Sequence, residues 1–131
     1  MKIVAIIEAR MTSSRLPGKV MMTVLGKPML YYLVERLKRV PSIDEIVLAT
    51  TLNKADDKLI EFAISENISY FRGSEDDVMF RVVEAADSVG ADIVVEITGD
   101  CPIIDPQIVE QTILMYMANN EIGRASCRER V

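Results

Sequence analysis

Four short apolar runs, each about the length of one β-strand, alternate with segments whose apolar residues recur at helical spacing. The runs are KIVAII at residues 2–7, EIVLAT at 45–50, ISYF at 68–71 and DIVVEIT at 92–98. Helical spacing marks the stretches 29–40, 55–65, 78–89 and 105–118. The first two runs, rich in Ile, Val and Leu, are typical of buried parallel strands, and the other two also predict strands. We therefore expect an α/β fold with a largely parallel sheet and right-handed crossovers.

Local signals predict where the helices begin. Pro28 suits the first position of the first helix, where its missing N–H costs nothing. Asp56 and Asp57 fall in the first turn of the second helix, where they complement the positive end of its dipole. Ser74, followed by an acid three residues later, resembles a capping box that opens the third helix. Arg81 is expected on the exposed face of that helix.

The residue types present limit the chemistry. There is no histidine, and the two cysteines, Cys101 and Cys127, lie in unrelated contexts. These facts argue against Ser-His and Cys-His nucleophiles, the commonest transition-metal sites and a disulfide framework. Any chemistry must therefore use carboxylates, cations and a hard metal ion.

Composition and charge limit the compartment and the partners. The chain has 131 residues, of which 50% are hydrophobic, enough for one domain with a core. No apolar run approaches the roughly 20 residues of a membrane span, and the start of the chain lacks signal-peptide features. The net charge is −5 without a continuous basic stripe. We expect a cytoplasmic protein with neither a membrane nor a nucleic acid as partner.

The loop after the first apolar run, EARMTSSRLPGK at residues 8–19, gathers cations among small residues and turn formers. Guanidinium forks, an ammonium and hydroxyls are groups that neutralise a polyphosphate. The side-chain donors are Arg10, Thr12, Ser13, Ser14, Arg15 and Lys19. The loop matches neither the Walker A pattern nor G-x-G-x-x-G. From spacing alone, a polyphosphate site and a solvated surface loop both remain open.

A second loop, Gly99 to Pro102, follows the fourth apolar run. Ligands of open α/β sheets bind outside the carboxyl ends of the strands, and both loops are expected at that edge. Asp100 at a strand end opposite a basic loop can bridge a metal ion to a phosphate, although an Asp before a Cys-Pro turn also fits a purely structural Asx turn. The convergence of two loops favours a ligand site.

Four blocks of sequence carry a family resemblance. They are IIEARMTSSRLPGKVMMTVLGKPML, EIVLATT, FRGSEDDVMFR and ITGDCPIIDP, and they occur in this order within residues 1–120. The blocks resemble the cytidylyltransferases that make CMP-linked acidic sugars, including the acylneuraminate and KDO types, and most closely the spore coat polysaccharide type. The resemblance implies the amino-terminal half of a three-layer sandwich of the glycosyltransferase-A type, with residues 1–120 as its nucleotide-binding portion.

The same resemblance implies an activity and its partners. The activity is transfer of a cytidylyl group from CTP to an acidic sugar, with release of pyrophosphate. Mg²⁺ is the implied cofactor, and a homodimer is compatible with the full-length protein. Two alternatives stay open, namely a glycosyltransferase of the same fold and a non-catalytic nucleotide-binding domain.

Residue roles follow from the resemblance position by position. Arg15, Lys19 and Asp100 are implied as catalytic residues, with Asp100 also as the magnesium ligand. The nucleotide-binding residues implied are Arg10, Ser13, Ser14, Arg15, Lys19 and Arg72. Asp76, Asp77 and Arg81 lie in the same block as Arg72, which in this group lies near the base or the sugar.

Glu8 departs from the family pattern, because the wider group often has Pro or Gln there. A carboxylate beside a triphosphate is costly unless it pairs with a cation or a water-bound metal. A hydrogen bond to the base or the ribose is the other option for Glu8.

The last eleven residues, EIGRASCRERV at 121–131, break the pattern of the rest of the chain. They have no hydrophobic period, and they match the in-frame translation of a widely used sequencing adapter. We expect residues 121–131 to be a foreign, disordered tail and the native protein to continue beyond Asn120. A native unstructured tail is the alternative.

Overall fold

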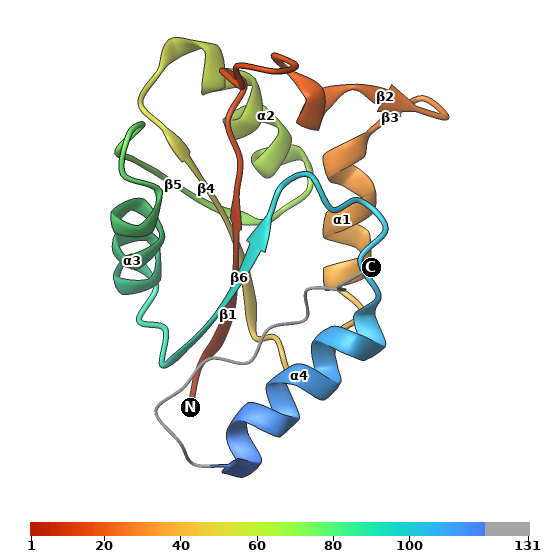
Figure 1. The fold of residues 1–131 in the computed structure, drawn as a ribbon, viewed down its shortest axis with the longest axis vertical. Helices are drawn as coiled ribbons and strands as arrows, with labels where there is room; N and C mark the ends of the chain where they lie inside the picture. Colours follow the sequence, from red (N-terminus) through yellow and green to blue (C-terminus); the bar gives the residue numbers. More distant parts are fainter. Residues whose placement is uncertain (120–131) are drawn as a thin grey trace.

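A computed structural model describes residues 1–119 of the chain, and its centre is a four-stranded parallel sheet (Figure 1). The strand order is β5-β4-β1-β6. The strands are β1 (Ile3–Glu8), β4 (Glu45–Thr51), β5 (Ser69–Gly73) and β6 (Ile93–Thr98). Each lies within two residues of the apolar run that predicted it. The expected α/β fold with a parallel sheet is confirmed.

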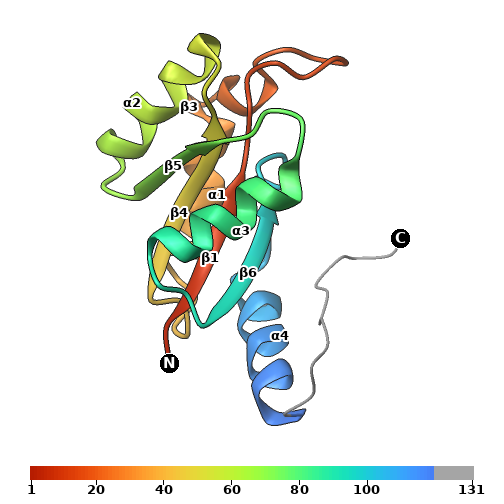
Figure 2. The ribbon, with the colours of Figure 1, turned by 90° about the vertical axis from the view of Figure 1, so that its left-hand side faces the viewer.

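Helices cover both faces of the sheet. Successive side chains of β1 point to opposite faces and therefore lie alternately in two cores. Ala5 and Ile7 lie in the core beneath α1 (Met29–Leu37) and α2 (Asp57–Ser65). Val4 and Ile6 lie in the core beneath α3 (Val78–Ser88), which crosses the opposite face (Figure 2). The two cores give three layers, as the resemblance implies.

The last helix described, α4 (Pro106–Asn119), packs near the amino end of the sheet. Its Val109 and Ile113 join Ile3 and Val40 in a third, smaller apolar cluster. None of the helices in residues 1–119 combines the length and hydropathy needed to cross a lipid bilayer. The expectations for residues 121–131 lie outside the described residues.

Apolar spacing predicts the start of α1 at Met29 correctly, but the placement of Pro28 at the first helical position is wrong. Pro28 closes the short strand β3 (Lys27–Pro28), which pairs with β2 (Thr23–Val24) in an antiparallel hairpin, and α1 begins one residue later. A proline fits an edge strand as well as it fits a first helical turn. The local signal therefore located a boundary without deciding what lies on each side of it.

The predicted cap of α3 is also wrong. Asp77 is the capping residue, and its carboxylate accepts the Phe80 N–H at 2.9 Å. The Ser74 hydroxyl accepts the Asp77 N–H at 3.0 Å, so Ser74 shapes the turn before the cap. Both residue types are strong caps, so residue type alone does not decide which of the two begins the helix.

Candidate functional site

The two loops predicted to converge do lie at the carboxyl edge of the sheet. β1 and β6 are neighbours whose last residues, Glu8 and Thr98, are register partners. The Gly99 N–H donates to the Glu8 carbonyl at 2.8 Å, which holds the starts of the two loops together. The edge therefore brings together, in one site, Asp100 and the loop of residues 8–19, which we call the basic loop.

Gly99 allows this close approach. A Cβ atom on Gly99 would lie 2.8 Å from the Ala9 Cβ and 2.9 Å from the Glu8 carbonyl oxygen. One of these neighbours is backbone, so relief requires the two loops to move apart.

We expect Gly99→Ala to lower the free energy of unfolding by about 1–3 kcal/mol, the usual cost of forced overpacking. Urea unfolding of the purified chain measures the change. Cys101→Ala, in the same turn and exposed, is the matched control and should change stability by less than about 0.5 kcal/mol. Equal stability of Gly99→Ala and wild type would contradict the crowding argument.

A backbone contact between Met11 and Gly18 closes the basic loop, and these two residues form what we call its neck. The Gly18 N–H donates to the Met11 carbonyl at 2.8 Å, and Gly18 adopts a left-handed φ of 74°. A non-glycine residue is disfavoured in this conformation. Between these two residues, Ser14 and Arg15 are exposed, whereas Thr12 and Ser13 are half-buried and the Thr12 hydroxyl donates to the Glu75 carboxylate at 3.2 Å.

Asp56 holds the Met11 side of the neck in place. It lies in the short 3₁₀ turn Lys54–Asp56, immediately before α2, and is fully buried. Its carboxylate accepts the Met11 N–H at 2.7 Å and also a hydrogen bond from the buried Thr51 hydroxyl. The sequence predicted only a helix-dipole role for Asp56, so this positioning role was missed.

The arginines of the basic loop are available to a ligand. Arg10, Ser14 and Arg15 are exposed, and among residues 1–119 neither arginine forms an ion pair. Ser13 is half-buried in the same loop. The structure therefore places four predicted nucleotide-binding residues within residues 10–15, and three of them are exposed.

Lys19 and Asp100 meet across the site. The Lys19 Nζ lies 3.2 Å from an Asp100 carboxylate oxygen, and both side chains remain partly exposed. The Thr98 hydroxyl and the Lys19 ammonium hold the pKa of Asp100 below its ordinary value, so this carboxylate is ionised at neutral pH. The three residues implied as catalytic thus share one edge of the sheet.

Arg81 and Glu8 form a second charged pair, and the expected exposure of Arg81 is wrong. Arg81 is 1% exposed, and its Nη1 donates to the Ser74 carbonyl at 2.7 Å. Its Nη2 lies 3.9 Å from a Glu8 carboxylate oxygen, and its Nε has no partner among the described residues. Burial raises the pKa of Glu8, and the nearby Arg81 charge opposes that rise.

All three guanidinium nitrogens of Arg72 have hydrogen-bond partners at the end of β4 or in the segment that follows it. Its Nε and Nη2 donate to the Thr51 and Asn53 carbonyls at 2.7 and 2.8 Å, and its Nη1 pairs with Asp57 at 2.8 Å. These contacts give Arg72 a positioning role in the structure. Its predicted contact with a nucleotide stays a prediction.

The donor set fits magnesium that is carried by a polyphosphate. Within the described part of the chain, no three Cys, His, Asp or Glu side chains cluster closely enough to hold a metal ion. Mg²⁺ commonly takes one or two carboxylates together with substrate phosphates and waters. Asp100, ionised and partly exposed beside the basic loop, is suited to supply one such ligand.

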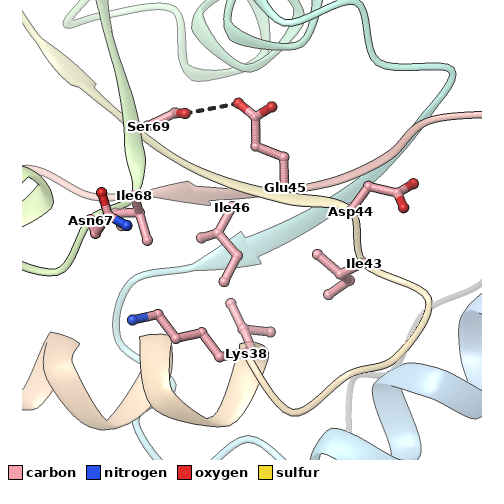
Figure 3. A pocket seen from close by; sticks show the side chains of 9 residues that line it. Lys38, Ile43, Asp44, Glu45, Ile46, Asn67, Ile68 and Ser69 are labelled. Carbon is pink, nitrogen blue, oxygen red and sulfur yellow. Dashed lines mark hydrogen bonds between the residues drawn. The ribbon is translucent and has the colours of Figure 1, made fainter.

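A groove lies at the opposite, amino-terminal edge of the sheet (Figure 3). It is lined by residues that include Lys38, Asp44, Glu45, Asn67 and Ser69. Its main polar groups already have partners: Glu45 accepts from Ser69 at 2.8 Å, and Lys38 donates to the Glu66 carbonyl. The groove offers no group prepared for catalysis.

Comparison with known proteins gives a consistent result. The family model described as cytidylyltransferase matches residues 4–130. That range includes most of the segment predicted to be foreign, whose origin stays a prediction. A cytidylyltransferase structure from Leptospira borgpetersenii superposes with a TM-score of 0.87 at 38% identity, covering 92% of this chain and 50% of that one.

Two further relatives agree with it. The structure of CMP:2-keto-3-deoxy-manno-octonic acid synthetase complexed with CTP has a TM-score of 0.77 at 31% identity, covering 91% of this chain and 48% of that one. The spore coat polysaccharide biosynthesis protein SpsF of Bacillus subtilis is 36% identical over 85% of this chain and 48% of its own length. The chain spans about half the length of the curated relatives it matches.

Proposed function

Because this chain belongs to the cytidylyltransferase family, we propose that the protein containing it transfers a cytidylyl group from CTP to an acidic sugar. The products are a CMP-sugar and pyrophosphate. The observation that carries the proposal is the pairing of Lys19 with Asp100 beside the exposed arginines of the basic loop. A site of this kind offers separate partners for phosphate oxygens and for a metal ion.

The sugar class is inferred from the relatives. The synthetase with CTP bound acts on 2-keto-3-deoxy-manno-octonic acid by its name, and several curated relatives are named 3-deoxy-manno-octulosonate cytidylyltransferases. Both names denote an acidic sugar. The name of the Bacillus subtilis relative further supports a role for the product in surface polysaccharide synthesis.

In the proposed reaction, a sugar hydroxyl attacks the α-phosphorus of CTP as the bond to the β-phosphate breaks. The hydroxyl proton is lost to solvent or a nearby base, and pyrophosphate leaves with the bonding electrons. Phosphoryl transfer depends mostly on positioning and charge neutralisation. Arg10, Ser14 and Arg15 hold the phosphate oxygens, and Lys19 neutralises charge that develops on the leaving group.

Magnesium would be held by Asp100 together with phosphate oxygens of CTP. When bound, it supplies further charge neutralisation at the phosphates. The protein's part is to keep the Asp100 carboxylate ionised and fixed at the strand end, which the Gly99 contact and the low pKa of Asp100 achieve.

The test is release of pyrophosphate by a protein that contains this chain and has the length of its relatives. We expect release that requires CTP, Mg²⁺ and an acidic sugar together. Arg15→Ala should weaken use of CTP by about tenfold, the effect of losing a charge-assisted hydrogen bond. Arg39→Ala, on an exposed surface outside the basic loop, is the control.

The alternatives predict different outcomes. Turnover of a preformed nucleotide sugar without pyrophosphate release would favour a glycosyltransferase. CTP binding without any turnover would favour a non-catalytic domain. The cytoplasmic location and the homodimer stay predictions.

A further inference from the structure

Glu8 places a carboxylate at the same edge as the cations but toward the other face of the sheet. Along β1, Ile7 and Ala9 lie in the core beneath α1 and α2, whereas Val4 and Ile6 lie in the core beneath α3. Strand alternation puts Glu8 on the α3 side. Lys19 begins a short turn that packs against α1 on the other side. The cation and the carboxylate are therefore offered to different parts of any ligand that spans the edge.

Arg81 holds this carboxylate from beneath. Arg81 is buried, and its guanidinium is fixed by a hydrogen bond to the Ser74 carbonyl. Its Nη2 lies 3.9 Å from a Glu8 carboxylate oxygen. Its Nε has no partner within residues 1–119. The side chain of Glu8 itself is 22% exposed, so a ligand at this edge of the sheet can reach it. The Glu8 carboxylate, positioned by Arg81, is available to accept a hydrogen bond from such a ligand.

The ligand part that suits Glu8 is uncharged, because the carboxylate itself repels anions and the charge of Arg81 already faces it at 3.9 Å. Burial raises the pKa of Glu8, and of the charged groups nearby Arg81 and Arg10 oppose that rise while Glu96 and Asp100 add to it. Phosphate groups there would be repelled, whereas the basic loop and Lys19 attract them. The nucleoside end of a nucleotide is thus the part left to face Glu8.

Cytosine and uracil differ in the group that would meet a carboxylate. Cytosine carries an amino donor at position 4, and carboxylates accept hydrogen bonds from that group. Uracil carries a carbonyl acceptor there, so an ionised carboxylate, which is an acceptor only, would face another acceptor. A buried pairing of two acceptors is unfavourable because neither is satisfied.

We propose that Glu8 is a specificity-determining residue that selects the cytosine base by accepting a hydrogen bond from its 4-amino group, with Arg81 as the positioning residue. The inference rests on the proposed function, since it assumes that the phosphates of the nucleotide lie at the basic loop. It assigns a role to the residue that departs from the family pattern.

The test compares binding of CTP and UTP to the chain and to Glu8→Gln by titration calorimetry in Mg²⁺. We expect the wild type to bind CTP at least about tenfold more tightly than UTP, the discrimination of one good base contact. Removing the negative charge of Glu8 should raise the affinity for both anionic nucleotides by the same factor. The readout is therefore the ratio of the affinity for CTP to the affinity for UTP. The Gln amide donates as well as accepts, so Glu8→Gln should reduce the ratio to about threefold or less.

Controls separate this role from its rivals. Glu45→Gln removes a carboxylate at the far edge of the sheet and should leave the ratio unchanged. Equal ratios in wild type and Glu8→Gln would overturn the inference. A loss for CTP but not for 2′-deoxy-CTP on mutation would also overturn it, because Glu8 would then bind the ribose.

Two further outcomes are decisive. If circular dichroism shows that Glu8→Gln does not fold, the wild type is titrated instead with the CTP analogue that lacks the 4-amino group. We expect weaker binding of the analogue than of CTP, and equal affinities overturn the inference. If the folded wild type binds neither CTP nor UTP, the nucleotide site under "Proposed function" fails, and the inference fails with it. CTP binding without preference over UTP overturns the inference alone.

Discussion

Asp56→Ala should lower the free energy of unfolding by about 3 kcal/mol, the upper part of the range for losing a buried hydrogen-bond acceptor. Asp56 is fully buried and accepts from both the Met11 N–H and the Thr51 hydroxyl. Alanine leaves both donors without a partner inside the protein. The same change releases the neck of the basic loop, so nucleotide binding should weaken as well.

Urea unfolding measures the stability, and titration with CTP measures the loop. Asp57→Ala is the matched control, because Asp57 is the neighbouring acid and its pair with Arg72 is half exposed. Exposed pairs contribute about 0–1 kcal/mol, so the control should cost much less. Asp56→Asn retains one acceptor oxygen and should recover part of the loss. A cost for Asp56→Ala no larger than for Asp57→Ala would show that Asp56 does not anchor the loop.

The layout of the fold was predictable because it depends on spacing of apolar residues over whole elements. The four strands coincide with short runs in which most residues are apolar, and the two central strands, β1 and β4, are buried on both faces as a parallel sheet requires. Once the strands are parallel, their carboxyl ends must share an edge. The approach of Lys19 to Asp100, separated by 81 residues in sequence, follows from that rule.

The role of Arg81 was missed although its signal is in the sequence. The buried residues of α3 are Arg81, Val82, Ala85 and Ala86, and Arg81 occupies a core-facing place in that helical period. Its charge suggested the exposed face, because an isolated buried cation is costly. The counter charge of Glu8 lies on a distant strand, and only the tertiary structure brings the two together.

The role of Asp56 was missed for a different reason. Its position before α2 has a sufficient local explanation in the helix dipole, which an exposed acid satisfies equally well. Its burial depends on the basic loop lying over it, 45 residues away in sequence. Contacts between two loops carry no periodic signal, so spacing cannot reveal them.

The Lys19–Asp100 pair yields a prediction whose sign depends on magnesium. Without the metal, the Asp100 carboxylate repels the triphosphate and also engages Lys19 at 3.2 Å. Asp100→Asn removes both effects, so CTP should bind about threefold more tightly to the variant than to wild type, the scale of a surface charge interaction. With the metal, Asn is a poorer ligand than a carboxylate, and CTP should bind about tenfold more weakly to the variant.

Titration calorimetry with CTP in EDTA and in Mg²⁺ measures both arms on the same proteins. Lys19→Met is the counterpart, because losing the ammonium should weaken CTP binding by about tenfold or more in both buffers. Cytidine, which has no phosphates, should bind Lys19→Met and wild type alike. Equal effects of Asp100→Asn in the two buffers would remove Asp100 from the metal site and leave it as a turn residue that pairs with Lys19. A change of sign between the buffers is expected only if the same carboxylate repels the free triphosphate and binds the metal that the triphosphate carries, because an Asx-turn role is indifferent to magnesium.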